Sequence, residues 1–353
     1  MEKMTMRNVW IGVDVGTTGV RAIAYRADGM KLAFDEAFYP LSTPHPDWAE
    51  EDPLEIVQAT EKVIRKTGEQ LVSKGITPHG IALSTIMHTF MPLDTAHQPI
   101  APMMTWADSR SGEIVQELRQ DTTFSKALYR RTGCPVHACY PFPKILWLKR
   151  RQRSLFDKMA YVGSIKDYLF FMLTGEWVID HSTASTSGMY CEETMDWDEE
   201  AVAYLGLSRD RLPRPVSTTH SEPMNAAASK RLGMPEGIPV VIGATDGVLV
   251  NVGIGAVHQG QLSATIGTSG AIRMLTQKPM VDEKMRTWCY NLVDGMWVSG
   301  GAINNGGMIL RWMRDEVLGY TEEDMKRLGV DAYDLMTMQA EHVPAGAGGL
   351  LLL

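Results

Sequence analysis

The sequence predicts a layered α/β fold made of two related halves. Short β-like runs alternate with helical periodicity, which is typical of an α/β domain. One glycine–threonine turn, flanked by β-like runs, occurs twice at a wide separation in the chain. The chain has 353 residues, which is enough for two domains and a large core. Two hairpins of one design therefore indicate two related domain halves that face one cleft.

The first element is a hairpin that a third strand extends to a meander. An apolar run from Val9 to Asp14 precedes the turn Gly16-Thr17-Thr18-Gly19, and a second run from Val20 to Tyr25 follows it. A third run lies between Leu32 and Tyr39. Strand-like runs joined through small turn residues are typical of antiparallel pairing.

A long amphipathic helix follows the meander. Asp52 is a suitable N-cap, Pro53 suits the first helical position, and Glu55 lies three residues after the cap. Gly75 is the expected stop. Five side chains form the expected apolar stripe: Leu54, Val57, Val63, Ile64 and Leu71.

Two buried strands and the second turn complete the pattern. The runs Gly80 to Ser84 and Val240 to Ala244 are continuous and apolar, as buried strands are. The second turn, Gly267-Thr268-Ser269-Gly270, lies between the β-like runs Leu262 to Ile266 and Ala271 to Leu275. Like the first turn, it lies between two β-like runs.

The chemistry of both turns suits a phosphate group. Backbone N–H groups of a tight glycine turn can point at an anion, and the hydroxyls of Thr17, Thr18, Thr268 and Ser269 add donors. Neither turn has the lysine of a P-loop or the glycine spacing of a dinucleotide-binding fold. Asp14, two residues before the first turn, would repel phosphate unless a cation such as Mg²⁺ lay between them. Capping of the turn by the Asp14 side chain is the alternative, and the residues alone do not decide between the two.

Composition excludes several classes of protein. The formal net charge of −8 argues against binding to nucleic acid or to an anionic membrane. The sequence has no run of 18 apolar residues, and the stretch from Met1 to Arg7 lacks the apolar core that a signal peptide would have. Its four cysteines are scattered, as in a cytoplasmic protein with reduced thiols.

An ordered set of motifs resembles one enzyme family. The segment Ile11 to Thr18 is similar to the first phosphate motif of the actin-like ATPase fold. Further segments narrow the resemblance to the FGGY carbohydrate kinases. The order and spacing of these segments match that family from about Val9 to Leu353. The segments are Met87-His88, Thr105 to Ser111, Lys144 to Leu148, Gly163 to Tyr168, Leu173 to Gly175, Gly243 to Gly247 and Ile266 to Gly270. Each motif is weak alone, whereas the ordered set is specific.

Within that family the chain resembles gluconokinases. Xylulokinases usually follow the catalytic aspartate with Asn and glycerol kinases with Gln, whereas Gly247 follows Asp246 here. The run Gly300 to Gly307, which precedes Leu310 to Asp315, is also similar to gluconokinases.

The resemblance implies an actin-like ATPase (ribonuclease H-like) fold with two related domains around a cleft. We expect an N-terminal domain at residues 8–245, with the sugar site and first phosphate turn. A partial C-terminal domain is expected at residues 246–353, with the second turn. The family's second signature and its adenine-binding segment have no counterpart before Leu353, so we expect a truncated chain.

Asp246 is the expected catalytic base. A carboxylate at a strand end can reach a substrate hydroxyl and take its proton, and the position matches the family base. The expected helix is Val248 to Ile254, and from the residues alone Asp246 is equally suited to be only its N-cap. Gly247 would leave room for the sugar chain.

The resemblance implies the remaining sugar contacts. His88 follows a predicted strand, where a neutral imidazole can bond a hydroxyl, although a lone histidine is more often structural. Arg110 can pair with a carboxylate in bidentate fashion, which would suit gluconate; a surface pair with Asp108 is the alternative. The full expected set is Met87, His88, Trp106, Asp108, Arg110, Tyr140 and Gly247.

ATP and Mg²⁺ are the expected cosubstrate and metal. Asp14 and Asp246 would serve the metal, and Arg21 could neutralise phosphate charge unless it is only an exposed strand charge. The expected nucleotide contacts are Asp14, Thr17, Thr18, Arg21, Gly267, Thr268, Gly307 and Arg311.

The resulting functional hypothesis is ATP-dependent phosphorylation of a sugar acid, D-gluconate first, to 6-phosphogluconate. One alternative is a kinase of a pentulose or polyol such as xylulose, and another is a truncated, inactive sugar-binding fragment. The expected partners are a sugar or sugar acid and ATP, with no nucleic acid and no membrane. A homodimer and a cytoplasmic location are compatible with the sequence.

Overall fold

The computed structural model describes residues 8–267, 269–303 and 305–350. The chain divides into two compact units: one runs to Leu262 and includes Met274–Gly300, and the other consists of Ser263–Arg273 and the residues from Gly301 onward. The expected domain boundary after residue 245 lies within the first unit, because Val248 packs in one core cluster with Tyr290 and Val298. Thr268 lies outside the described residues.

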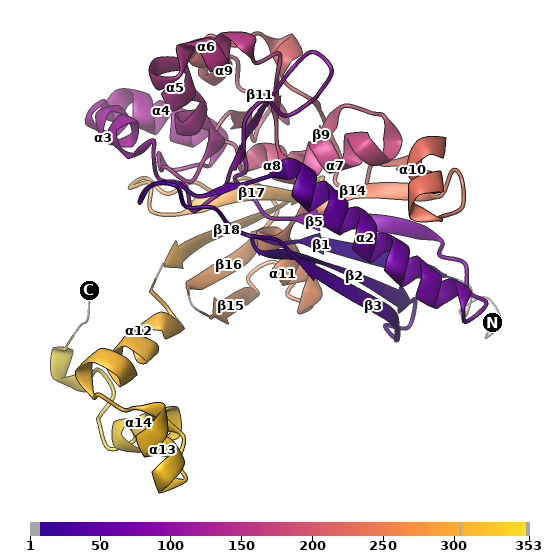
Figure 1. Cartoon of the computed structure of the whole chain (residues 1–353). Helices are drawn as coiled ribbons and strands as arrows, with labels where there is room; N and C mark the ends of the chain where they lie inside the picture. The colour runs from indigo at the N-terminus through magenta and orange to yellow at the C-terminus, as the bar shows by residue number, and fades with distance from the viewer. Residues whose placement is uncertain (1–7, 268, 304, 351–353) are drawn as a thin grey trace. The chain divides into compact units, whose positions relative to one another are not determined.

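The largest sheet of the described residues has six strands and belongs to the first unit (Figure 1). Its order is β13-β14-β5-β1-β2-β3. The three central strands β14, β5 and β1 are parallel, whereas β13, β2 and β3 pair antiparallel at the edges. The bounds are β1 Val9–Val15, β2 Gly19–Arg26, β3 Lys31–Phe38, β5 Gly80–Thr85, β13 Ser221–Pro223 and β14 Pro239–Thr245. The predicted meander and both predicted buried strands are confirmed.

Helix α2, Pro53–Val72, covers one face of this sheet. The Asp52 carboxylate accepts a hydrogen bond from the backbone N–H of Leu54, which confirms the predicted N-cap. Two details of the prediction were wrong. The Leu54 side chain is 44% exposed, because the stripe that faces the sheet runs through Ile56 instead. The helix ends at Val72, and Gly75 forms the turn that follows it.

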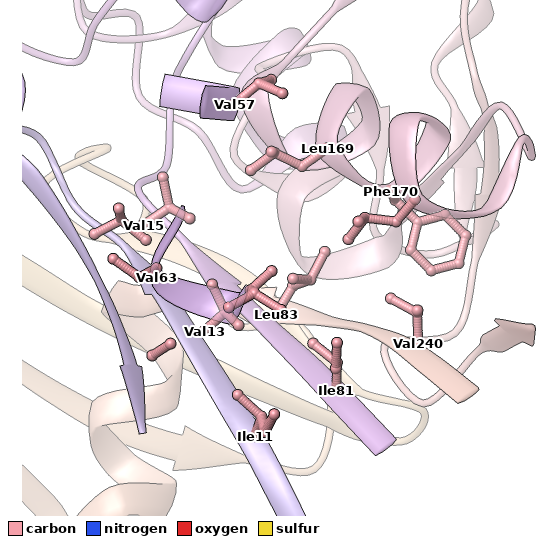
Figure 2. Packing of buried hydrophobic residues seen from close by; sticks show 14 of the residues in the cluster. Ile11, Val13, Val15, Val57, Val63, Ile81, Leu83, Leu169, Phe170 and Val240 are labelled. Atoms are coloured by element: carbon pink, nitrogen blue, oxygen red, sulfur yellow. The ribbon is translucent and has the colours of Figure 1, made fainter. Parts of the chain in front are cut away.

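Helices α7, Ile165–Thr174, and α10, Ala226–Leu232, extend the same layer. Figure 2 shows Leu169 and Phe170 of α7 above the strands, beside Val57 of α2. Helix α7 begins with a capping box in which Asp167 accepts from the backbone N–H of Ser164. One face of the parallel strands lies under these helices, because buried residues alternate with less buried ones along β1, β5 and β14.

A second core lies among helices between β7 and β13 in the chain. It gathers α3 Gly112–Gln120, α4 Thr122–Thr132, α5 Pro141–Arg151, α6 Arg153–Lys158 and α9 Glu199–Leu205. Short strands connect them: β6 Met91–Leu93 with β8 Tyr161–Gly163, β4 Glu50–Glu51 with β7 Met103–Met104, β9 Val178–Asp180 with β12 Arg214–Val216, and β10 Tyr190–Cys191 with β11 Asp196–Trp197. Helix α8, His181–Ser185, and the 3₁₀ turn η1, Arg209–Arg211, complete the region.

A further sheet has the order β15-β16-β18-β17 within the described residues. Its strands are β15 Leu262–Ile266, β16 Gly270–Thr276, β17 Trp288–Val293 and β18 Met296–Ile303. The second predicted hairpin, β15 and β16, is therefore confirmed. After β18 come α12 Gly307–Trp312, the π-helical segment η2 Met313–Val317, α13 Glu322–Leu328, α14 Ala332–Ala340 and the 3₁₀ turn η3 Ala347–Gly349. No described helix is long and apolar enough to cross a membrane.

Candidate active site

The candidate site lies where three parallel strands end. Strands β1, β5 and β14 run in the same direction, so their carboxyl ends meet at one edge of the sheet. Asp14 lies next to the end of β1, His88 shortly follows β5, and Asp246 directly follows β14. Asp14 and Ala244 are both paired with Ser84 of β5, so they occupy one row across the sheet. The topology therefore brings together candidate residues that are far apart in the sequence.

Asp246 is the first residue of helix α11, Asp246–Gly253, and its N-cap is Thr245. Asp246 is therefore not the N-cap, so that alternative is wrong by one position. The helix begins at Asp246, two residues before the expected start at Val248. The Asp246 Oδ1 atom accepts from the backbone N–H of Gly247 at 2.7 Å. A carboxylate at a helix N-terminus is favoured by the helix dipole, which stabilises its charged form.

The first phosphate turn is closed by its own backbone and by two aromatic residues. The Gly16 N–H donates to the Gly19 carbonyl at 2.8 Å, and the Tyr39 hydroxyl donates to the Gly16 carbonyl at 2.6 Å. The indole N–H of Trp106 donates to the Thr17 hydroxyl at 2.9 Å. Trp106, an expected sugar contact that is 45% exposed, is thus joined directly to the phosphate turn.

The other first-turn candidates are more exposed. Thr18 contributes its carbonyl oxygen to the backbone N–H of Tyr39. Arg21 lies opposite Asp14 in the β1–β2 ladder, but its side chain is 57% exposed and pairs with Glu36 at 3.4 Å. In this structure Arg21 is thus an exposed charge on a strand, which was the alternative to a phosphate contact. Its role toward phosphate stays a prediction.

His88 is held in one orientation and one protonation state. It has a φ of 64°, and its Nδ1 lies 2.8 Å from the Thr186 carbonyl oxygen. Because a carbonyl only accepts, Nδ1 must carry the hydrogen, and Nε2 is the acceptor of the neutral ring. Burial lowers the pKa of His88 to about 3, so the ring is neutral at physiological pH. A neutral acceptor nitrogen suits a hydrogen bond from a sugar hydroxyl.

Tyr140 packs against His88, and a residue that the sequence analysis missed completes the group. The rings of His88 and Tyr140 meet edge to face at 4.8 Å. The Tyr140 hydroxyl lies 2.7 Å from that of Tyr290, whose own ring is 5.7 Å from His88. Tyr290 lies on β17 and stacks on Trp288. Nothing in its local sequence marked it, because its position depends on tertiary contacts alone.

Met87 and Gly247 lie against each other. A Cβ atom added at Gly247 would lie 2.1 Å from Cε of Met87. The space beside Gly247 is therefore filled by the end of a flexible side chain, which can move to admit a ligand. The structure thereby brings together two of the expected sugar contacts.

Asp108 and Arg110 form a buried network. The Arg110 guanidinium pairs with Asp108 at 2.6 Å and with Glu50 at 2.7 Å, and it stacks on Trp48 with its carbon 3.7 Å from the ring centre. The Asp108 Oδ2 atom also accepts from the backbone N–H of Ala49 at 2.8 Å. Only 2% of the Arg110 side chain is exposed, so neither the surface-pair alternative nor direct access to a substrate carboxylate matches its surroundings.

Two candidates of the second unit, Gly267 and Gly307, meet at the second turn. The Gly267 N–H donates to the Ser269 carbonyl at 2.8 Å, and the Gly307 N–H donates to the Gly267 carbonyl at 2.6 Å. Gly306 has no room for a side chain, because an added Cβ would lie 2.6 Å from the Ser269 oxygen. Arg311 lies in the last turn of α12. Gly267 and Gly307 are therefore neighbours, as one phosphate-binding segment would require.

The carboxylates suit a hydrated metal ion better than a fully protein-bound one. Among the residues that the structure describes, no group of three or more His, Cys, Asp or Glu side chains could hold a metal. Asp14 accepts from the Ser84 hydroxyl at 3.0 Å. One or two carboxylates, with water and phosphate oxygens as the other ligands, are what Mg²⁺ prefers in such sites.

Comparison with known proteins decides the family. Residues 9–253 match the model for the N-terminal domain of the FGGY family of carbohydrate kinases. The chain belongs to this family. Its fold is accordingly the actin-like ATPase fold, as the sequence predicted, and it is a kinase that phosphorylates an alcohol group of a carbohydrate, with ATP as the family's phosphate donor.

Individual FGGY kinases are similar over nearly the whole chain. A gluconokinase of Bacillus subtilis (strain 168) is 39% identical over 350 residues, which are 98% of this chain and 67% of the relative. A gluconate kinase of Lactobacillus acidophilus has a similar solved structure, with a TM-score of 0.89, 30% identity and coverage of 98% and 68%. A xylulose kinase of Rhodospirillum rubrum has a TM-score of 0.89, 28% identity and coverage of 97% and 69%. The chain thus spans about two thirds of the length of these relatives.

Proposed function

We propose that this protein transfers the γ-phosphate of ATP to the terminal hydroxyl of D-gluconate, producing 6-phosphogluconate and ADP. The observation that carries the proposal is the similarity to gluconokinases, at 39% identity over 98% of the chain. The sequence Asp246-Gly247 at the start of α11 agrees with it, because this pair resembles gluconokinases rather than xylulokinases or glycerol kinases.

Asp246 acts as the general base. Its carboxylate accepts the proton of the terminal hydroxyl while that oxygen bonds to the γ-phosphorus. The bond from the γ-phosphorus to the β–γ bridging oxygen breaks, and ADP leaves with the bonding electrons. The Gly247 N–H donates to the carboxylate and orients it at the start of α11 before the transfer.

The sugar is held by groups around the same strand ends. Nε2 of His88 accepts from a sugar hydroxyl, and the exposed indole of Trp106 packs on a C–H face of the sugar. Met87 moves aside to admit the chain of the substrate. Arg110 contributes indirectly: its ion pairs and its stacking on Trp48 fix the segment that carries Trp106.

Thr17 and Thr18 contact phosphate at the first turn, and Gly267, Thr268, Gly307 and Arg311 are proposed for the second. Asp14 and Asp246 would hold Mg²⁺, which neutralises phosphate charge when it is bound. The Ser84 hydroxyl donates to Asp14, which leaves the second carboxylate oxygen of Asp14 for a water of the ion.

A substrate panel tests the proposal. ADP release by the purified chain is measured with D-gluconate, D-xylulose and D-ribulose, and Asp246→Asn is run in parallel to exclude a contaminating kinase. We expect kcat/KM for gluconate to exceed that for either pentulose by at least about a hundredfold, because a site that hydrogen-bonds the polar groups of one substrate rejects an analogue that lacks them. Absence of gluconate turnover above the Asp246→Asn background would contradict the proposal.

A pentulose kinase is the second candidate. The observation that favours it is the similarity to the xylulose kinase of Rhodospirillum rubrum, whose TM-score of 0.89 equals that of the gluconate kinase. Higher kcat/KM with D-xylulose than with D-gluconate would establish this candidate. Binding of gluconate by calorimetry, without turnover, would instead indicate a sugar-binding chain without catalysis.

A further inference from the structure

Two lysine side chains are completely buried in the first unit, and the proposed chemistry uses neither. Lys144 and Lys166 are each 0% exposed. Burying an ammonium group is costly unless its hydrogen-bond donors are satisfied. Each of these groups is surrounded by backbone carbonyl oxygens, and the segments that supply those carbonyls contain the candidate site residues.

Lys144 lies on α5 and joins three segments that are distant in the sequence. Its Nζ donates to the carbonyls of His88 at 3.0 Å, Thr105 at 2.6 Å and Cys139 at 2.6 Å. His88 is a proposed sugar contact, Thr105 directly precedes Trp106, and Cys139 directly precedes Tyr140. One ammonium group therefore fixes the backbone beside each of three proposed sugar-site residues.

Lysine is well suited to this position. Its three N–H donors match three carbonyl acceptors, and a charged donor forms hydrogen bonds roughly twice as strong as a neutral one. Burial lowers the pKa of Lys144 to about 8, so the group is still mostly charged at pH 7. An uncharged side chain of similar length would leave three buried carbonyls without this donor.

Lys166 lies on α7, under the ends of β5 and β14. Its Nζ donates to the carbonyls of Ile242 at 2.9 Å, Ala244 at 2.8 Å and Leu83 at 3.3 Å. The Asp180 carboxylate lies 4.0 Å away and balances its charge. These carbonyls come from the two strands whose ends lead to His88 and to Asp246.

The β5–β14 ladder is irregular at this point. Its register shifts between Val241 and Ala244, and Gly243 within the shift has a φ of +71°. An added Cβ at Gly243 would lie 1.8 Å from the Leu83 carbonyl oxygen, so only glycine fits. A bulge of this kind frees carbonyls from the ladder and redirects the strand. Lys166 satisfies the freed carbonyls on both sides of the bulge, just before the chain reaches Asp246.

We propose that the two buried lysines are positioning residues with separate tasks: Lys144 aligns the sugar-contacting segments, and Lys166 aligns the strand end that presents Asp246. The proposal rests on the function proposed above, which assigns these segments to the sugar site and to the catalytic base. Neither ammonium group touches the substrate. Each acts through the backbone carbonyls that it holds.

The experiment compares Lys144→Met, Lys166→Met and the control Lys149→Met. Lys149 lies on α5 with Lys144, but its Nζ only reaches the Tyr204 carbonyl at 3.5 Å. We expect Lys144→Met to raise KM for the sugar about tenfold with little change in kcat, since the lost alignment concerns binding contacts. Lys166→Met is expected to lower kcat about a hundredfold with little change in sugar KM, as for a displaced catalytic group. Lys149→Met should change neither constant.

A merely structural role would lower stability without this separation. If both variants lose stability but keep KM and kcat within about twofold of wild type, the proposal is wrong. Equal effects of the two variants on both constants would also overturn it. Should Lys144→Met fail to fold, Lys144→Gln, which keeps two donors, is expected to give an intermediate rise in KM.

A readout without turnover separates this proposal from the proposed function. In ¹⁵N-histidine NMR spectra, His88 is assigned with His88→Asn and is expected as the Nδ1–H tautomer. Lys144→Met should shift the His88 signals, whereas Lys166→Met and Lys149→Met should leave them in place. If the wild type does not phosphorylate gluconate, the proposed function fails, and this pattern still supports the role of Lys144. Unchanged His88 signals in Lys144→Met would contradict that role.

Discussion

A buried carboxyl group should make the stability of this kinase depend on pH. Glu51 lies on β4, is 2% exposed, and both of its carboxyl oxygens are buried without a hydrogen-bond partner among the described residues. Burial raises the pKa of Glu51 to about 8. The folded protein therefore keeps this proton up to about pH 8, whereas the unfolded chain releases it near its ordinary value of about 4.3.

The sign of the effect follows from proton binding. Between these two pKa values the folded state binds more protons than the unfolded state, so stability falls as the pH rises. One proton changes the free energy of unfolding by about 1.4 kcal/mol per pH unit, which amounts to about 3 kcal/mol between pH 5 and pH 7. Glu51→Gln keeps the shape of the side chain but cannot ionise, so it should lack this contribution.

Urea denaturation at pH 5, 6 and 7 measures the effect. The stability of Glu51→Gln relative to wild type should rise by up to about 3 kcal/mol from pH 5 to pH 7. Comparison of the two proteins is needed because Asp167, whose pKa burial raises to about 7, adds a pH dependence of its own. Glu55→Gln, on the exposed surface of α2, is the matched control and should follow the wild type. A constant difference between Glu51→Gln and wild type across this range would refute the reasoning.

Three further substitutions test the site. Gly247→Ala should fold, because the new methyl group meets only the flexible end of Met87. The KM for the sugar should nevertheless rise about tenfold in steady-state kinetics. An unchanged KM would show that the substrate does not use the space beside Gly247. Tyr290→Phe removes the hydrogen bond to Tyr140 and should lower the free energy of unfolding by about 1 kcal/mol in denaturant titrations. If the free energy of unfolding does not fall measurably, this hydrogen bond is not formed in solution. Trp106→Phe loses the hydrogen bond to the first phosphate turn, and KM for ATP is expected to rise about fivefold; a change confined to the sugar KM would contradict that link.

The regular elements near the start of the chain could be predicted because local signals agree there. The turn residues between β1 and β2 and the cap at Asp52 mark their elements directly. Leu54 was misassigned because a stripe read from spacing alone does not reveal which residues face the sheet. The cap of α11 was misplaced by one residue, since Thr245 and Asp246 are both acceptable at a helix start.

The sequence names candidate site residues, whose roles stay predictions, but it does not show how these residues are connected in the fold. The convergence of Asp14, His88 and Asp246 follows from the parallel order of β14, β5 and β1, which no local pattern specifies. Tyr290 was missed for the same reason. The environment of Arg110 was also unpredictable, because its partner Glu50 lies 60 residues away in the chain.

The proposed role of Asp246 is tested most directly by the turnover of Asp246→Asn. The asparagine keeps the size of the side chain and the acceptor for the Gly247 N–H, but it cannot take a proton. With saturating ATP and gluconate, kcat should fall about a hundredfold or more while the gluconate KM changes by less than about threefold. A kcat within about tenfold of wild type would contradict the assignment of Asp246 as the base of this kinase.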